Sequence, residues 1–416
     1  MKRERIEEFN PWWFTGKVPT ELLYKYKRKL FYDLAESLKK RYAASIVGLR
    51  RTGKTTLMFQ VIQKLLDDST EKTNILYFNF DEFVENLDDL MDTYRELKSK
   101  DLRNDKVYVF LDEIQKLSDW TNQLKKYYDL YPKIKFFVSG SESLFIASKT
   151  KETLAGRINE FRLNPLSFEE YAEIKDAGNQ PSVKMKTLFS EYLENGGFPE
   201  VIGKSRQEIK DYVKSVVLDK IIFKDIVVLF GIKDTETIRQ LVEIIASNPG
   251  MYLDYQSIAK QLDKDRRSIK TYIMLLNDSF LIKILGNYRK GKLSSIRKLK
   301  RVYPVDTSII VAFNQNIDEK LIGQMAETAI VNSLHSNNFW KNSHEVDIIY
   351  ENMPIEIKYK RKILGGDISG VREFMRKFSV KKGIVITKDE ERKVSVEEGS
   401  INLIPAWIFL SKTKEK

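Results

Sequence analysis

The sequence predicts an α/β protein of several domains, and three observations support this prediction. The chain has 416 residues, which at about 100 to 200 residues per domain predicts two to four domains. Continuous apolar runs alternate with helical patterns between residues 43 and 161, which is typical of a parallel sheet covered by helices on both faces. A loop with the pattern G-x-x-x-x-G-K-T follows the first of these runs. Residues 304–416 repeat the alternation as a second, smaller α/β unit.

Composition and charge restrict the class of protein. Lys and Arg total 71 against 59 Asp and Glu, and the formal net charge of +12 favours an anionic partner such as nucleic acid. The chain has no Cys and only two His, so thiol chemistry is excluded and we expect any metal to be bound mainly by oxygen. The N-terminus lacks a signal-peptide pattern and no run approaches 18 apolar residues. We therefore expect a cytoplasmic protein with no membrane partner.

The loop at residues 48–55 predicts a phosphate-binding site. Its sequence Gly48-Leu-Arg-Arg-Thr-Gly53-Lys54-Thr55 follows a predicted strand and opens a predicted helix. In such a loop backbone N–H groups surround the β-phosphate, the lysine reaches the β- and γ-oxygens, and the threonine hydroxyl ligates Mg²⁺. The expected nucleotide-binding residues here are Gly48, Arg51, Thr52, Gly53, Lys54, Thr55 and Thr56, with a solvent-facing side chain as the alternative for Arg51.

A second predicted strand, at residues 107–111, ends in Asp112 and Glu113. At the carboxyl end of a strand beside the loop, Asp112 is expected to hold Mg²⁺ through water, and Glu113 to orient or deprotonate the attacking water. The alternative for Glu113 is a surface acid. Ser139 ends another buried strand and is assigned a sensor role at the γ-phosphate, with Ser141 or a plain turn as alternatives.

Six segments together resemble the archaeal and bacterial AAA-type ATPases that carry a C-terminal nuclease-like domain. They are Gly48 to Thr55, Asp112-Glu113-Ile114-Gln115, Ser139-Gly140-Ser141, Leu154-Ala155-Gly156-Arg157, Pro165-Leu166-Ser167-Phe168-Glu169-Glu170 and Gly196-Gly197-Phe198-Pro199-Glu200. The resemblance spans nearly the whole chain. It implies an additional-strand P-loop core that uses ATP, Mg²⁺ and a catalytic glutamate, followed by a winged helix and a restriction-endonuclease-like C-terminus.

The resemblance and the element order predict four domains. They are a P-loop domain with an N-terminal arm at residues 1–165, a helical connector at 166–235, a winged helix at 236–303 and a PD-(D/E)xK nuclease-like domain at 304–416. Lys54 and Glu113 are the expected catalytic residues of the first domain. Arg157 joins them as an arginine finger toward a neighbouring subunit, and its alternative is a salt bridge or a capping role.

Residues 237–301 have the element order of a winged helix. The apolar positions of the helix near residues 266–277 face one core, so Arg266, Arg267 and Lys270 turn outward, as in a helix that enters the major groove. The following hairpin contains no acid, and its cations are Arg289, Lys290, Lys292, Arg297, Lys298, Lys300 and Arg301. We therefore expect contact with DNA. A protein-interaction module and a plain connector are the alternatives.

The C-terminal residues contain a second acidic pattern. Glu327 lies in a predicted helix, Asp347 in a strand, and Glu356-Ile-Lys358 on the next strand. Alternate residues of a strand share a face, so Glu356 and Lys358 point together, and a hairpin brings Asp347 beside them. This is the pattern of PD-(D/E)xK nucleases, except that Val346 replaces the usual proline.

In such a site carboxylates bind Mg²⁺ and the lysine positions or activates water. Glu327, Asp347 and Glu356 are the expected metal ligands and Lys358 the expected catalytic residue. Because such domains also degenerate into binding platforms, DNA cleavage stays open.

The sequence thus predicts an ATP-hydrolysing protein that interacts with DNA, in which nucleotide state controls the winged helix and the nuclease-like domain. One alternative is a nucleotide-gated regulator or scaffold that binds a protein partner and cuts nothing. Another is a motor that translocates on nucleic acid. Assembly into a homo-oligomer is left open by the sequence.

Overall fold

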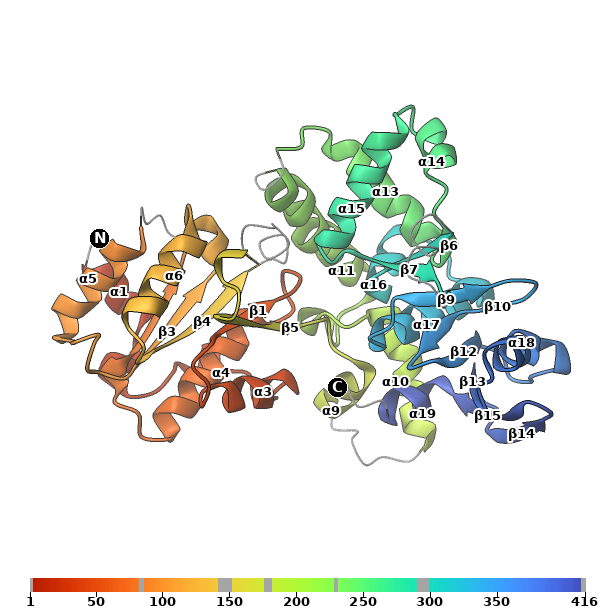
Figure 1. Ribbon diagram of the computed structural model, residues 1–416, viewed down its shortest axis with the longest axis horizontal. Coiled ribbons are helices and arrows are strands. Elements are labelled where there is room, and N and C mark those ends of the chain that lie inside the picture. Colours follow the sequence, from red (N-terminus) through yellow and green to blue (C-terminus); the bar gives the residue numbers. More distant parts are fainter. Residues whose placement is uncertain are drawn as a thin grey trace. The chain divides into compact units, whose positions relative to one another are not determined.

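Figure 1 shows the computed structural model of the chain. The structure describes residues 3–81, 86–140, 152–175, 182–227, 231–289 and 299–412. The chain divides into two compact units, Met1–Asn164 and Pro165–Lys416. The finer division into four domains stays a prediction. Within the described ranges, no helix has both the length and the apolar character needed to cross a bilayer.

Five parallel strands form the sheet of the first unit, in the order β2-β3-β4-β1-β5. They are β1 (Ala43–Val47), β2 (Ile75–Asn79), β3 (Val107–Asp112), β4 (Ile134–Gly140) and β5 (Ile158–Arg162). Every residue of β1, β3 and β4 is buried, which explains the continuous apolar runs and confirms the predicted parallel sheet. The strand β4 lies between β1 and β3 and is the additional strand that the resemblance implied.

The helices of the first unit pack around this sheet (Figure 1). They are α1 (Arg3–Phe9), α2 (Trp12–Thr15), α3 (Leu30–Ser37), α4 (Lys54–Asp67), α5 (Leu87–Lys98) and α6 (Trp120–Leu130). The indole N–H groups of Trp12 and Trp13 both donate to the carbonyl of Ile75, at 3.2 and 2.7 Å. These two buried rings therefore fasten the N-terminal arm to the start of β2.

Two sheets and several helices form the second unit. The first sheet has the order β10-β9-β7-β8-β6, and its strands are β6 (Met251–Tyr252), β7 (Ile282–Asn287), β8 (Lys300–Pro304), β9 (Asn338–Lys341) and β10 (Glu345–Val346). The second has the order β11-β12-β13-β15-β14, and its strands are β11 (Ile348–Tyr350), β12 (Met353–Lys358), β13 (Lys382–Thr387), β14 (Arg392–Val396) and β15 (Gly399–Pro405). Because β9 pairs in parallel with β7, one sheet joins residues on both sides of position 303.

Several α-helices of this unit contribute to one core. They are α9 (Phe168–Ile174), α10 (Ser182–Asn195), α11 (Arg206–Asp211), α13 (Thr235–Ser247), α14 (Tyr255–Gln261), α15 (Arg266–Asp278), α16 (Thr307–Phe313), α17 (Glu319–Ser333), α18 (Ser369–Phe378) and α19 (Ala406–Lys412). Two π-helical segments, Tyr212–Leu218 and Ile221–Ile226, follow α11. One buried apolar cluster runs from α9 and α10 through α16 and α17 to the second sheet and α19.

The Gly196-Gly197 turn is held by a buried carboxylate. A Cβ on Gly196 would lie 2.1 Å from Oδ1 of Asp306, and one on Gly197 would lie 2.5 Å from the carbonyl O of Leu166. Asp306 accepts the N–H of Gly197 at 2.8 Å and the N–H of Ser308 at 2.9 Å. Its burial raises its pKa. The glycine motif is therefore explained by close packing, since only glycine leaves room for these contacts.

Replacing Asp306 by alanine should lower the free energy of unfolding by about 3 kcal/mol, because two buried N–H groups lose their acceptor. Urea denaturation measures this loss. Asp318→Ala is a matched control, because Asp318 caps α17 through Leu321 N–H at an exposed position and should lose only about 1 kcal/mol. Equal losses in the two variants would contradict the structural role given to Asp306.

Candidate functional site

The predicted phosphate-binding loop connects β1 to α4 at the carboxyl end of β1. A Cβ on Gly48 would lie 2.2 Å from the carbonyl O of Leu163, and Gly53 has a φ of 99° immediately before the helix. Both positions therefore require glycine. The first N–H groups of α4 have no helical acceptor, which makes this helix terminus suited to an anion.

Polar contacts hold the loop in shape. The Nζ atom of Lys54 donates to the carbonyl oxygens of Gly48 and Leu49, at 2.9 and 2.8 Å. Arg28, which lies in no sequence motif of the site, donates to the carbonyls of Thr52 at 3.1 Å and Asn164 at 3.0 Å. Lys54 is thus already positioned inside the loop, and the buried Arg28 supports the loop from the N-terminal arm.

Asp112 is fully buried and accepts three hydroxyl groups from three elements. The Thr55 hydroxyl donates at 2.6 Å, the Tyr77 hydroxyl at 3.0 Å, and the Ser139 hydroxyl is also in contact. Thr55 and Asp112 therefore present adjoining oxygens beside the phosphate loop, and this pair fits the ligand chemistry of Mg²⁺.

Tyr77 is a site residue that the sequence did not reveal. It lies in the apolar run of β2, where it reads as an ordinary core residue. Burial, reinforced by the carboxylate of Asp112, raises the pKa of Tyr77 well above its usual value. The phenol therefore stays protonated and donates to Asp112, which fixes that carboxylate.

Glu113 stands at the end of β3 in a left-handed backbone conformation, with a φ of 53°. Its N–H lies 3.1 Å from Oδ1 of Asp112 and 3.2 Å from the hydroxyl of Ser139. Its carboxylate accepts the side-chain amide of Gln115 at 2.5 Å. The turn after β3 thus sets the direction of Glu113, and Gln115 holds its carboxylate. No pattern in the sequence predicts this contact of Gln115.

Arg157 lies at the opposite edge of the sheet from the loop. Its carbonyl accepts the N–H of Ala43 at the start of β1, whereas the loop follows the end of that strand. Five strand residues span about 16 Å, so Arg157 is out of reach of phosphates bound to its own loop. The guanidinium instead pairs with Asp129 at 2.8 Å and lowers the pKa of that carboxyl. A finger role, which stays a prediction, requires a second copy of the chain.

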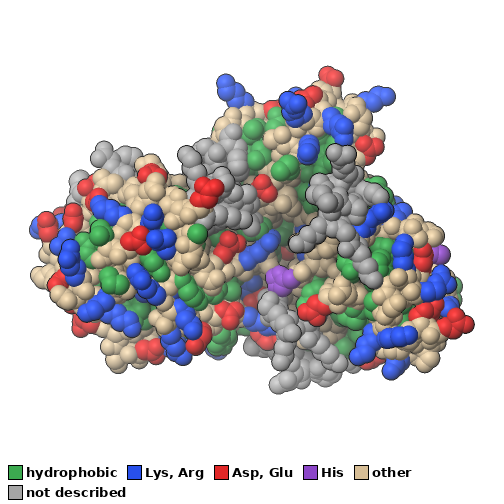
Figure 2. Space-filling model, in the orientation of Figure 1, with side chains coloured by type: hydrophobic (Ala, Val, Ile, Leu, Met, Phe, Trp, Pro, Cys, Tyr) green, Lys and Arg blue, Asp and Glu red, His purple; other side chains and the backbone are tan. Residues whose placement is uncertain are grey.

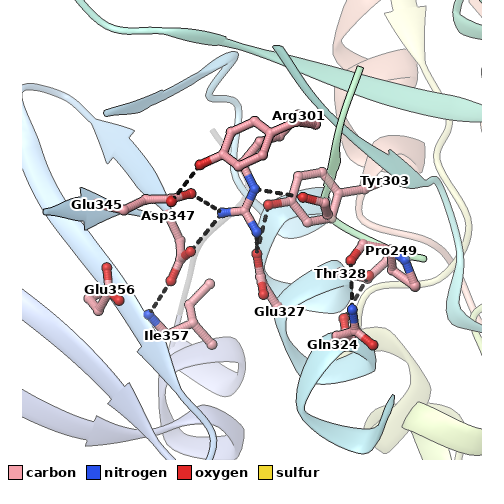
Figure 3. A network of polar contacts seen from close by, with 12 residues as sticks. Pro249, Arg301, Tyr303, Gln324, Glu327, Thr328, Glu345, Asp347, Glu356 and Ile357 are labelled. Carbon is pink, nitrogen blue, oxygen red and sulfur yellow. Dashed lines mark hydrogen bonds and ion pairs between the residues drawn. The ribbon is translucent and has the colours of Figure 1, made fainter. Parts of the chain in front are cut away.

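The second unit brings the predicted acidic pattern together (Figure 3). Ile348 of β11 pairs with Ile355 of β12, which places Asp347 opposite Glu356. Lys358 forms an ion pair with Oε1 of Glu356. Asp347 accepts the N–H of Ile357 at 2.8 Å through Oδ2. Burial and the nearby Asp347 raise the pKa of Glu356 well above its usual value.

A buried arginine lies among these acids (Figure 3). Arg301 pairs with Asp347 at 2.8 Å, with Glu327 at 2.6 Å and with Glu345 at 3.1 Å. Burial opposes its charge, but these carboxylates raise its pKa. Burial and Asp347 together raise the pKa of Glu327 to about 7.

Across the described part of the chain, no three Asp, Glu or His side chains are grouped as metal ligands. The acids around Arg301 are arranged for a guanidinium, so in this arrangement they do not fit a divalent metal. The sequence pattern groups Arg301 with the basic hairpin and does not point to Glu345. The predicted ligands Glu327, Asp347 and Glu356 are close to one another, but Arg301 already engages the first two.

The predicted nucleic-acid residues are only partly described. Arg266, Arg267 and Lys270 are exposed on α15, and Arg289 is exposed just after β7. Figure 2 shows Lys and Arg side chains projecting from the end of the second unit that carries α14 and α15. The remaining predicted residues, Lys290, Lys292, Arg297 and Lys298, and also Ser141 of the first unit, lie outside the described residues.

Comparison with protein families supports the assignment of the first unit. Residues 40–172 match the family described as AAA domain, and residues 186–320 match a family described as domain of unknown function (DUF8612). The first match covers the segment that holds the glycine loop and the five-stranded parallel sheet, and it supports an AAA-type P-loop fold for residues 40–172.

Two relatives are uncharacterized proteins. One, from Haemophilus influenzae, is 29% identical over 248 residues, which are 57% of this chain and 60% of that protein. The chain thus spans about three fifths of that relative. The other, from Methanocaldococcus jannaschii, is 24% identical over 93% of this chain and 89% of its own length.

Solved structures are similar at a low level. The Walker-type ATPase PABY2304 of Pyrococcus abyssi has a TM-score of 0.42 and 15% identity, and covers 69% of this chain and 95% of its own. The Orc1 protein of Aeropyrum pernix in complex with DNA has a TM-score of 0.34 and 14% identity, and covers 71% of this chain and 91% of its own. TM-scores of this size do not bear on function.

Proposed function

We propose that the first unit binds and hydrolyses MgATP. The observation that carries this proposal is the contact between Thr55 and Asp112 at 2.6 Å, beside a glycine loop that holds Lys54. Bound ATP supplies the phosphoryl group and Mg²⁺ neutralises its charge. ATP hydrolysis that requires Mg²⁺ and disappears in Lys54→Ala tests the proposal.

The chain's own residues have separate tasks in this reaction. Lys54 offers its ammonium to phosphate oxygens, in place of the loop carbonyls that it now contacts. Thr55 and Asp112 would bind the Mg²⁺ ion. Glu113 orients the attacking water and accepts its proton, once Gln115 releases the carboxylate. Ser139 senses the γ-phosphate through its contacts with Asp112 and Glu113.

We further propose that residues around α15 bind DNA as a winged helix. The order α13, β6, α14, α15, β7, β8, with antiparallel pairing of β8 to both β6 and β7, supports this fold. Arg266, Arg267 and Lys270 are exposed on the helix that would enter the groove. Nucleotide state in the first unit then controls DNA binding by the second.

Replacing Arg266, Arg267 and Lys270 together by alanine should weaken duplex binding and lower the slope of log K against log salt by about 3, because three phosphate contacts are lost. Fluorescence anisotropy over a salt series measures both quantities. Triple replacement of the exposed Lys362, Lys381 and Lys382 removes the same charge and should change neither by as much. The same decrease in both triple variants would argue against a specific role for α15.

The C-terminal part of the second unit is proposed to have a restriction-endonuclease-like fold. The order α17, β11, β12, α18, β13, with antiparallel β11-β12 and parallel β12-β13 pairing, supports it. Because Arg301 binds two of the three predicted metal ligands, the arrangement favours the alternative in which this domain cuts nothing. DNA cleavage is therefore not part of the proposed function.

A further inference from the structure

We infer that the guanidinium of Arg301 takes the place of a divalent cation in the acid cluster, defined as Glu327, Glu345, Asp347 and Glu356. The cluster then carries a cation supplied by β8 of the same chain. It binds a divalent metal only when Arg301 is removed. This inference concerns the second unit and does not depend on ATP hydrolysis by the first.

Each of the three guanidinium nitrogens of Arg301 donates to an acceptor. Nη1 donates to Asp347 and lies 3.1 Å from Glu345, Nη2 donates to Glu327 at 2.6 Å, and Nε donates to the carbonyl of Gly250 at 2.8 Å. Three carboxylates from α17, β10 and the residue before β11 thus converge on one planar cation. A guanidinium suits this role because its donors form a rigid fork and it keeps its charge when buried.

The surroundings of Arg301 are built to hold it. Gly250 has a φ of 81°, and a Cβ there would lie 2.8 Å from Nη2 of Arg301. Gln324 of α17 donates to the carbonyl of Pro249 at 3.1 Å, which ties the Gly250 turn to the helix that carries Glu327 (Figure 3). Tyr303 donates to Glu327 at 2.7 Å. Arg301 therefore occupies a specific site and is only 8% exposed.

One buried carboxylate oxygen of the acid cluster has no hydrogen-bond partner among the described residues. Glu356 is 5% exposed, and its Oε2 has no hydrogen-bond partner among the described residues, although Oε1 contacts Lys358. The pairing of β11 with β12 places Glu356 opposite Asp347. Without Arg301, the carboxylates of Glu327 and Asp347 would lose their cation beside the unpartnered Oε2 of Glu356, and carboxylate oxygens are the ligands that hard divalent cations prefer.

Arg301→Met tests the inference, because methionine fills much of the space without charge. Thermal unfolding of the full chain is measured without nucleotide, in EDTA and in Mn²⁺. We expect Arg301→Met to be less stable than the wild type in EDTA and to gain roughly 5 °C or more in Mn²⁺, while the wild type gains little. A gain in Arg301→Met no larger than that of the wild type would overturn the inference.

Glu356→Gln separates the acid cluster from every other place where Mn²⁺ binds. Added to Arg301→Met, it should remove the Mn²⁺ gain, and a gain that persists in the double variant would overturn the inference. The P-loop is unchanged in all these chains, so a failed ATPase proposal would leave these results untouched.

A second measurement tests the inference even if Arg301→Met fails to fold. Electron paramagnetic resonance counts the Mn²⁺ ions bound by the wild type and by Glu356→Gln. The inference predicts equal numbers, because Arg301 keeps Mn²⁺ out of the cluster in both. An ion bound by the wild type and lost in Glu356→Gln would show that metal enters beside Arg301 and would contradict the inference.

Discussion

Replacing Lys54 by alanine is expected to lower ATP turnover roughly 100- to 1,000-fold. The reason is that the structure holds the Lys54 ammonium inside the loop, against the carbonyls of Gly48 and Leu49, and this charge would meet the phosphate oxygens of bound ATP. The affinity for ATP should also fall, because the same charge stabilises the bound nucleotide. Phosphate release measures turnover, and titration with a fluorescent ATP analogue measures affinity.

Lys64→Ala is the matched control for this experiment. Lys64 lies on the same helix, α4, but pairs with Asp68 at 2.8 Å near its far end. Its loss removes an equal charge and should leave turnover and affinity within a factor of about two, since partly exposed ion pairs contribute little. Unchanged turnover and affinity in Lys54→Ala would show that nucleotide does not use this loop.

Glu113→Gln is expected to separate binding from hydrolysis. The substitution keeps the shape of the side chain and removes its capacity to accept a proton, so turnover should fall roughly 100- to 10,000-fold. ATP affinity should stay close to that of the wild type, because the loop, Thr55 and Asp112 are untouched. Equilibrium binding and steady-state hydrolysis, measured on the same preparation, give both values.

Two outcomes would contradict the role given to Glu113. Wild-type turnover in Glu113→Gln would make this side chain the surface acid that the sequence left as an alternative. Loss of ATP binding together with turnover would instead indicate a structural role, exerted through the contact of its carboxylate with Gln115.

The grouping of Thr55 and Asp112 beside the glycine loop was largely predictable because its signals are local. Gly48, Lys54 and Thr55 fall within eight consecutive residues, and Asp112 ends an apolar run that forms a buried strand. Carboxyl ends of parallel strands meet at one edge of the sheet, so these segments had to converge. The strand order, with β4 between β1 and β3, followed from the resemblance and not from the pattern alone.

Contacts made by ordinary-looking residues were not predictable. Tyr77 sits in an apolar run, and only the parallel pairing of β2 with β3 brings its hydroxyl to Asp112. Gln115 lies in a quoted motif, but its contact with Glu113 depends on the left-handed turn at residue 113. In both cases the role depends on backbone geometry that composition and periodicity do not encode.

Arg301 shows how a local charge pattern misleads. Its position after a run of cations placed it among groups expected to bind phosphate. In the structure, β8 lies between β7 and β6 in a sheet, and its residue 301 faces acids from α17 and β10. Such a contact depends on pairing across long sequence separations, including β7 with β9, which no short window of sequence contains.

The most direct test of ATP hydrolysis at the Thr55–Asp112 site is a single-turnover measurement. ATP is first bound to an excess of enzyme in the absence of metal. Mg²⁺ is then added, and the ADP formed is quantified over time for the wild type and for Glu113→Gln. The proposed function predicts conversion of bound ATP to ADP by the wild type and persistence of bound ATP in the variant. Equal conversion by both chains, or no conversion of bound ATP by the wild type, would contradict it.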